Sequence, residues 1–263
     1  MPSVWIALAL GAAAPLPAQT PEETRSIAEA GAAGAELYAA DRAAWVASDA
    51  AIASIGRDRM PKTGGFVVER AGEASVVTFF AGTGAARTAI FTATVSEGRV
   101  QTARRVDPGV ALTPAQLRLA DAINAAGAEA VRRGWRPCGT ASFNAAALAP
   151  RSAGAPVRVY LLTPQSAADS VPMGGHYRVD VAADGSIAAA RAFTKACLEV
   201  RPQPGKNGKP SAIVVSHLLD PVPTELHVFS SLAARLPVLV IAPDKRIWAV
   251  TGPRIRLTPA GTD

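Results

Sequence analysis

The sequence predicts an α+β fold, with an N-terminal helix, antiparallel strands, a second helix and then a β-rich C-terminal half built from hairpins. Three observations predict it. Helix-start signals followed by apolar residues at helical spacing occur twice, after residues 20 and 113. Short runs rich in Val, Ile, Phe and Thr, bounded by Gly, Asp or Pro, fill much of the remaining chain. The composition, 49% hydrophobic and 18% charged, is typical of a globular protein.

The first helix is predicted to begin at Thr20-Pro21-Glu22-Glu23, where a capping hydroxyl is followed by proline and then by a glutamate in the capping-box position. Apolar or small residues recur at helical spacing as far as Ile55. Gly31 and Gly34 weaken this pattern, so the segment is either one helix or two. Gly56 is expected to end it.

Strands are predicted next, over residues 65–70, 75–80 and 88–95. Gly72-Glu73 and Glu97-Gly98 supply the turns. A second helix begins at Thr113-Pro114-Ala115-Gln116, which again places a hydroxyl, a proline and a capping-box side chain in order. Gly134 is expected to stop this helix.

From residue 137 onward the sequence predicts strands throughout. They are expected over residues 157–162, 176–181, 187–193, 213–219, 225–230, 238–241 and 247–250. Asp184-Gly185 is a strong hairpin signal. The change of pattern predicts two lobes, residues 19–136 and 137–263, with one continuous domain as the alternative.

Two short similarities link the halves of the chain. Glu97-Gly98 resembles Asp184-Gly185 in its surroundings, and Gly64-Gly65 resembles Gly174-Gly175. A duplicated helix-plus-sheet unit would explain both similarities. Generic hairpin turns explain them as well, and this is the explanation we favour from sequence.

The N-terminus predicts export. Residues 4–18 form an apolar run that ends in small residues and prolines, and the first charged residue of the chain is Glu22. This run is shorter than the about 20 residues that span a bilayer, and it fits a signal peptide over residues 1–18. A membrane anchor and a buried N-terminal segment are the alternatives. Without a second long apolar stretch, we expect a periplasmic or secreted mature chain with no transmembrane segment.

The two cysteines are predicted to pair. In an oxidising compartment, Cys138 and Cys197 would most simply form one disulfide. Closing a loop of about 59 residues would stabilise the fold by up to about 4 kcal/mol. The spacing differs from the C-x-x-C pattern of redox catalysts. A nucleophilic cysteine would need a free thiol, which export argues against.

Charge and motifs exclude several function classes. The net charge is +6, but the arginines are scattered and no basic stripe is interleaved with aromatic residues, so nucleic acid is not an expected partner. The glycine-rich segment 82–87 is followed by a predicted strand instead of the helix that a dinucleotide-binding loop requires. No Walker A, GxSxG or SxxK motif occurs. We therefore predict no cofactor.

The most distinctive segment for chemistry contains two of the three histidines. If residues 213–219 and 225–230 form a hairpin, His217 and His227 would lie on one face, with Glu225 beside them and Asp220 at the tip. Two imidazoles and a carboxylate at this spacing are candidates for catalysis, or for a divalent metal site with Asp220 as a further ligand. A one-residue register shift would separate them. The alternative is that these histidines are structural, as we also expect for His176.

These observations favour a non-enzymatic function. We expect an exported binding or interaction module at the cell envelope, whose partner is an envelope protein, a peptide or a small ligand. An exposed sheet edge could recruit a peptide by strand addition, although no residue marks that edge in the sequence. The alternative is a hydrolase-type enzyme that uses His217, Glu225 and His227, with or without a metal ion.

Overall fold

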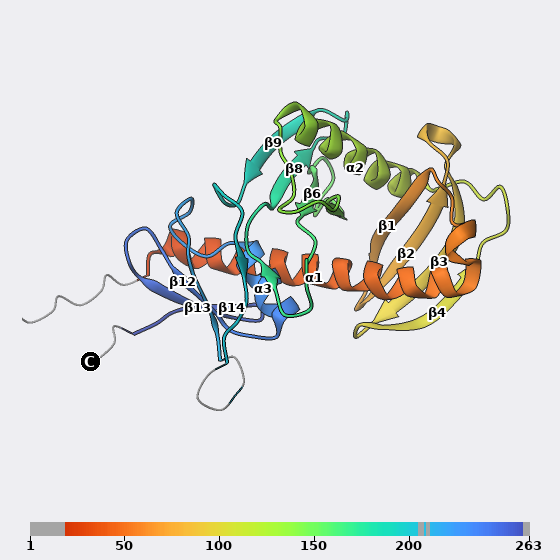
Figure 1. Cartoon of the computed structure of the whole chain (residues 1–263). Helices are drawn as coiled ribbons and strands as arrows, with labels where there is room; N and C mark the ends of the chain where they lie inside the picture. Colours follow the sequence, from red (N-terminus) through yellow and green to blue (C-terminus); the bar gives the residue numbers. More distant parts are fainter. Residues whose placement is uncertain (1–18, 205–207, 209–210, 260–263) are drawn as a thin grey trace, which may run out of the picture.

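The computed structural model describes residues 19–204, 208 and 211–259 and confirms the α+β class (Figure 1). The predicted signal peptide, residues 1–18, lies outside the described residues. The helices are α1 (Pro21–Ile55), α2 (Pro114–Arg132) and α3 (Glu225–Ala234). The strands are β1 (Gly64–Ala71), β2 (Ala74–Ala81), β3 (Thr88–Ser96), β4 (Arg99–Arg105), β5 (Asn144–Leu148), β6 (Val157–Leu162), β7 (Val171–Pro172), β8 (Tyr177–Val181), β9 (Ile187–Ala192), β10 (Glu199–Val200), β11 (Ile213–Ser216), β12 (Val238–Ile241), β13 (Ile247–Thr251) and β14 (Arg254–Leu257).

Helix α1 is a single helix that runs along the molecule (Figure 1). The predicted capping box is present, because Thr20 and Glu23 exchange side-chain and backbone hydrogen bonds. The two glycines that weaken its helical pattern lie where other segments approach α1. A Cβ atom at Gly34 would collide with Val228 of α3, and one at Gly31 would collide with the carbonyl of Pro253. Glycine lowers the helix propensity at these two positions, but it allows the neighbouring segments to pack closely against α1.

Three four-stranded sheets lie along α1. The first is an antiparallel meander in the order β1-β2-β3-β4, and the second has the order β5-β6-β8-β9. The third has the order β11-β12-β13-β14, in which β11 and β12 are parallel and α3 connects them. The short strands β7 and β10 form a separate antiparallel pair.

The prediction of a strand over residues 225–230 is wrong, because these residues begin helix α3. The apolar residues Leu226, Val228 and Phe229 favour a strand in the sequence. In the structure, Leu226 and Val228 are buried on one helix and pack against α1 and its neighbours. The sequence does not predict strands β4, β5, β7, β10 and β14. Strand β4 is mostly polar and exposed, with Val100 and Thr102 as its two β-branched residues, and β5 is Asn-Ala-Ala-Ala-Leu, which has none.

Helices α1 and α2 cover opposite faces of the first two sheets. The face towards α1 includes Phe79 and Phe91 from the first sheet and Tyr160 from the second. The face towards α2 includes Val67 from the first sheet and Val159 from the second. The two sheets therefore lie between the same two helices, with α2 on one side and α1 on the other (Figure 1).

Each of these sheets follows its own helix, in the order helix and then four meandering strands. Glu97-Gly98 and Asp184-Gly185 both connect the third and fourth strands of their sheet, which agrees with a duplicated unit. Gly64 begins the first strand of its sheet, whereas Gly174-Gly175 precedes the third, so the second similarity does not correspond. The topology therefore agrees with a duplication at the two turns, but not at the two glycine pairs.

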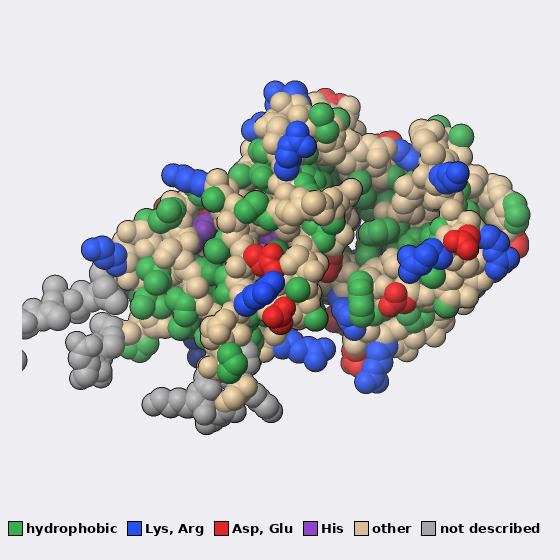
Figure 2. All heavy atoms as spheres, in the orientation of Figure 1, with side chains coloured by type: hydrophobic (Ala, Val, Ile, Leu, Met, Phe, Trp, Pro, Cys, Tyr) green, Lys and Arg blue, Asp and Glu red, His purple; other side chains and the backbone are tan. Residues whose placement is uncertain are grey.

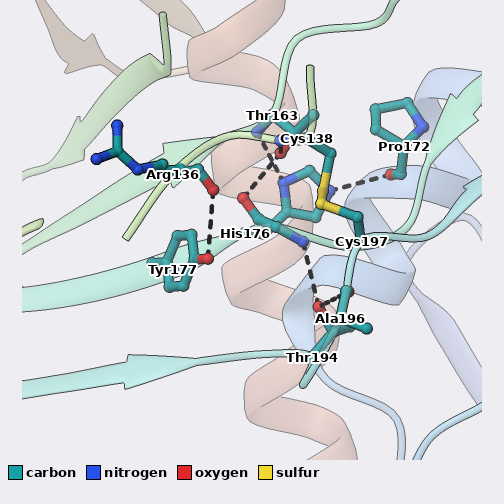
Figure 3. Close-up of a disulfide and its surroundings, with 10 residues drawn as sticks. Arg136, Cys138, Thr163, Pro172, His176, Tyr177, Thr194, Ala196 and Cys197 are labelled. Carbon is teal, nitrogen blue, oxygen red and sulfur yellow. Dashed lines mark hydrogen bonds between the residues drawn. A yellow bond between two sulfur atoms is a disulfide. The ribbon is translucent and has the colours of Figure 1, made fainter. Parts of the chain in front are cut away.

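The predicted disulfide between Cys138 and Cys197 is present, with Cα atoms 5.5 Å apart. It joins the loop after α2 to the loop after β9 and packs beside His176, as Figure 3 shows. Gly175 lies against it with φ of 70°, and a Cβ atom there would collide with Cys138 Sγ. Gly174-Gly175 is therefore explained by the close approach of the backbone to the disulfide.

None of the helices within the described residues is long and apolar enough to cross a membrane.

Candidate functional site

The two histidines of the predicted site do come together, but not across a hairpin. His217 directly follows β11, and His227 lies in the first turn of α3. Their rings are 4.7 Å apart between centroids and nearly perpendicular. His217 Nε2 is 2.8 Å from Asp220 Oδ2, so the predicted neighbourhood of these two residues is present. Both histidines are buried, and neither is among the residues that line the polar cavity at the start of α3.

His227 has a structural partner at the start of α3. Its Nδ1 atom accepts a hydrogen bond of 3.0 Å from the backbone N–H of Thr224, as the glutamate of a capping box does. Burial, together with the neighbouring His217, lowers the pKa of His227 to about 3. The ring is therefore neutral at physiological pH and able to accept this bond.

His176 is also held in a structural role. Its Nδ1 atom accepts a 3.0 Å hydrogen bond from the backbone N–H of Thr163, and its Nε2 atom lies 3.0 Å from the carbonyl oxygen of Pro172 (Figure 3). Burial lowers the pKa of His176. A neutral ring with Nε2 protonated satisfies both bonds.

Glu225 does not join the histidines. Its Oε1 atom accepts hydrogen bonds from Arg178 Nη1 at 2.8 Å and from the hydroxyl of Tyr160 at 3.1 Å. Burial, with the charge of Glu225, raises the pKa of Tyr160, so its hydroxyl stays protonated and donates. The three predicted catalytic residues thus have three different sets of partners.

A polar cavity of about 260 Å³ lies at the N-terminus of α3. Besides the exposed Glu29 of α1, its charged lining consists of two carboxylates that begin or precede α3 and of four arginines: Asp220, Glu225, Arg151, Arg158, Arg178 and Arg191. We call these six residues the α3 cluster. Each arginine forms an ion pair, the shortest being between Arg191 and Asp220 at 2.6 Å. The described residues contain no group of three or more His, Cys, Asp or Glu placed to hold a metal ion.

A second and less polar cavity lies where the first two sheets meet. It has a volume of about 380 Å³ and is lined by one edge of each sheet, residues 64–68 of β1 and residues 143–147 at β5. Helix α1 lines one side and α2 lines the other. Figure 2 shows the surface hollowed at this junction, with hydrophobic side chains gathered there.

This cavity continues into a neighbouring one of about 430 Å³. The second cavity shares Ala40, Val68 and Ala147 with the first and extends to Arg70 on β1 and Ala149 beyond β5. We call the two together the β1–β5 groove. Because both strands run from the first cavity to the second, β1 and β5 are parallel across it. The lined length of each strand is about six residues.

Both strands bordering the groove are edge strands with free hydrogen-bonding groups. The turn at residues 72–73 makes Ala71 and Ala74 a hydrogen-bonded pair, and Gly82 donates to the carbonyl of Thr63. Pairs alternate along an antiparallel ladder, so the N–H and C=O groups of Phe66 and Val68 point away from β2. Among the described residues these groups have no hydrogen-bond partner, and β5 does not pair with β1.

Asp41 is the one charged side chain that lines the first of these two cavities, the one of about 380 Å³. It is half-buried, and within the described part of the chain it forms no ion pair or hydrogen bond. Burial raises the pKa of Asp41 to about 6, against the opposing charge of Arg42. Arg42 itself is placed over the ring of Trp45, 4.3 Å from its centroid.

No protein-family model matches this chain, and neither the curated proteins nor the solved structures with which it was compared include a match.

Sequence reasoning identified His217, His227, Glu225 and Asp220 but missed Asp41 and the free edge of β1. Asp41 lies in the helical run of α1 and resembles any surface carboxylate in sequence. The free edge depends on which strand β1 faces, which is a property of the tertiary structure. The one available signal was Gly64-Gly65 before a strand, which is where the groove begins.

Proposed function

We propose that this protein is an exported, non-enzymatic binding module of the cell envelope that takes up an extended peptide segment in the β1–β5 groove. One observation carries the proposal: two parallel edge strands face each other across a largely apolar groove, and their outward N–H and C=O groups lack partners. An edge strand with such groups is a template for another strand. Export is supported by the apolar N-terminal run and by the disulfide.

A bound segment antiparallel to both strands would join the first two sheets. At their closest, Cα atoms of β1 and β5 lie within 8 Å. An inserted strand needs two spacings of about 4.8 Å each, so the sheets would separate slightly as it enters. Alternate side chains of the segment would then point towards α1 and towards α2. The small residues Ala40, Ala44 and Ala120 leave room for them.

The hydrolase alternative has less support. His217, His227 and Glu225 are held by separate partners, and neither histidine lines the polar cavity at the start of α3. A catalytic base must reach the proton that it abstracts from a bound substrate.

The first test is selection of binders from a displayed library of random heptapeptides, followed by affinity measurements on the enriched peptides. Val68→Pro removes one outward N–H without touching the ladder to β2, and we expect it to weaken binding at least tenfold. Val68→Ala keeps this N–H and is the matched control, with an expected loss of no more than about threefold. Peptides N-methylated at alternate residues should lose binding in both registers, because one set of alternate amides faces β1 and the other set faces β5.

Failure to enrich peptides, or equal binding by the protein and the Val68→Pro variant, would contradict the proposal. The N-methylated peptides keep the test valid even if that variant is poorly folded. A fatty acid that binds the groove and is not displaced by peptide would point instead to a ligand without a backbone.

A further inference from the structure

We infer that the groove selects peptide segments in which a lysine or arginine points towards α1 and is flanked by apolar residues that point towards α2. This inference rests on the proposed peptide-binding function and names the class of segment that is bound. It depends on the position of Asp41 in the groove and on the different linings of its two sides.

In the cavity of about 380 Å³, the side formed by α1 provides the only charged group of the lining. Asp41 is there with Ala40, Ala44 and Ser48, which are small. Small neighbours leave space for a long side chain to extend along the helix. The charge of a lysine or arginine would complete an ion pair that Asp41 lacks among the described residues.

The side formed by α2 is mainly apolar. Ala120 and Ile123 line it, with Asn124 as its polar residue. Phe80 from the first sheet and Phe143 next to β5 add aromatic surface to the cavity. An inserted strand alternates its side chains between two faces, so a basic residue on one face places its immediate neighbours on the other. The expected pattern is therefore apolar–basic–apolar.

The nearby positive charge does not satisfy Asp41. Arg42 follows it on α1, but its guanidinium stacks on Trp45, whose side chain is 57% exposed. In the adjoining part of the groove, Glu36 pairs with Arg158 at 3.2 Å, and Arg70 lies 3.9 Å from Glu73. Asp41 is thus the carboxylate left for a ligand.

The same library selection tests this inference with two further variants. Asp41→Asn removes the charge with little change of shape, and Asp49→Asn removes a charge from an exposed position on the same helix outside the groove. At pH 7.5 the protein and the Asp49→Asn variant should enrich peptides with Lys or Arg at one fixed position. Replacing that residue by norleucine should weaken binding about tenfold to these two proteins and less than twofold to Asp41→Asn.

The preference should also depend on pH. Because the pKa of Asp41 is about 6, the advantage of lysine over norleucine should shrink towards twofold at pH 5. Arg42, Glu36, Arg70 and Glu73 are the other charged groups near the groove.

The outcomes separate the two proposals. If enriched peptides bind but carry no basic residue, or bind the protein and the Asp41→Asn variant with the same preference, the inference on Asp41 is wrong and peptide binding stands. If no peptide is enriched by any of the proteins, peptide binding itself fails.

Discussion

The α3 cluster and the β1–β5 groove both contain polar and charged groups, but protein partners satisfy these groups to different degrees in the two regions. In the α3 cluster, Glu225 accepts from Arg178 and Tyr160, and Asp220 accepts from Arg191 and His217. In the groove, Asp41 and the outward backbone groups of Phe66 and Val68 have no partner among the described residues.

This difference indicates where a ligand is needed. The unused hydrogen-bonding groups of β1 and the charge of Asp41 are available to a ligand, whereas a network in which each charge is paired needs none. The contrast therefore supports a structural role for the α3 cluster, although it contains Asp220 and Glu225, two of the candidate site residues of the sequence.

The pKa values of two aspartates, Asp220 and Asp41, differ in the same way. Burial alone would raise the pKa of Asp220, but hydrogen bonds from His217 and Arg191 and the charge of Arg191 hold it well below its usual range. Burial raises the pKa of Asp41 to about 6, because the charge of Arg42 offsets the effect of burial only in part. Loss of the two charges should therefore change stability in opposite directions.

The largest effect is expected from Glu225→Ala, which leaves Tyr160 without its acceptor and leaves Arg178 with Asp180 as its one remaining partner. We expect the free energy of unfolding to fall by about 3 kcal/mol, as for other broken buried ion pairs. Denaturant-induced unfolding followed by circular dichroism measures it. Glu73→Ala, which breaks an exposed pair with Arg70, is the matched control and should change stability by no more than about 0.5 kcal/mol. If the Glu225→Ala variant were as stable as the unchanged protein, the structural role of the α3 cluster would be contradicted.

A smaller effect, of about 1–2 kcal/mol, is expected from Asp220→Asn at pH 7. The pKa of Asp220 is lower in the folded state than in the unfolded chain, so its charge stabilises the fold above the unfolded value near 4. This contribution disappears as the pH falls below about 4 and towards the folded pKa. The stabilities of the protein and of the variant, measured by urea unfolding from pH 7 down to pH 2, should therefore converge. A constant difference in unfolding free energy over this pH range would mean that the charge of Asp220 does not stabilise the folded state.

The fold was predictable from sequence where the signals are local. The capping boxes at Thr20 and Thr113 and the turn at Asp184-Gly185 act over a few residues and appear as expected. The start of α3 also has a capping hydroxyl, Thr224, but the residue three positions on is His227 instead of Glu or Gln. That substitution removed the usual sign of a helix start, and the apolar run that follows was read as a strand.

The candidate site was predictable only in part, because it depends on long-range packing. His217 and Asp220 are close in sequence, so their contact could be anticipated. The groove instead requires that β5, an alanine-rich strand, lies beside β1 without pairing to it. Nothing local in either segment specifies this, and nothing in α1 distinguishes Asp41 from the exposed Asp49.

The smallest effect, and the one of opposite sign, is expected from Asp41→Asn. A carboxyl whose pKa is raised in the folded state binds its proton more tightly there, so ionisation of Asp41 destabilises the fold as the pH rises from about 4 through 6. The asparagine variant avoids this loss. We expect it to be about 1 kcal/mol more stable than the protein at pH 8 and equally stable at pH 4.

Thermal and urea unfolding of both proteins at these two pH values measure the difference, with Asp49→Asn as the control that should change little at either. A destabilised Asp41→Asn variant at pH 8 would show that Asp41 has a stabilising partner, and the distinction between the groove and the α3 cluster would fail. A stabilised variant that also loses its preference for basic peptides would show that the fold keeps an unfavourable charge at this position because ligand binding uses it.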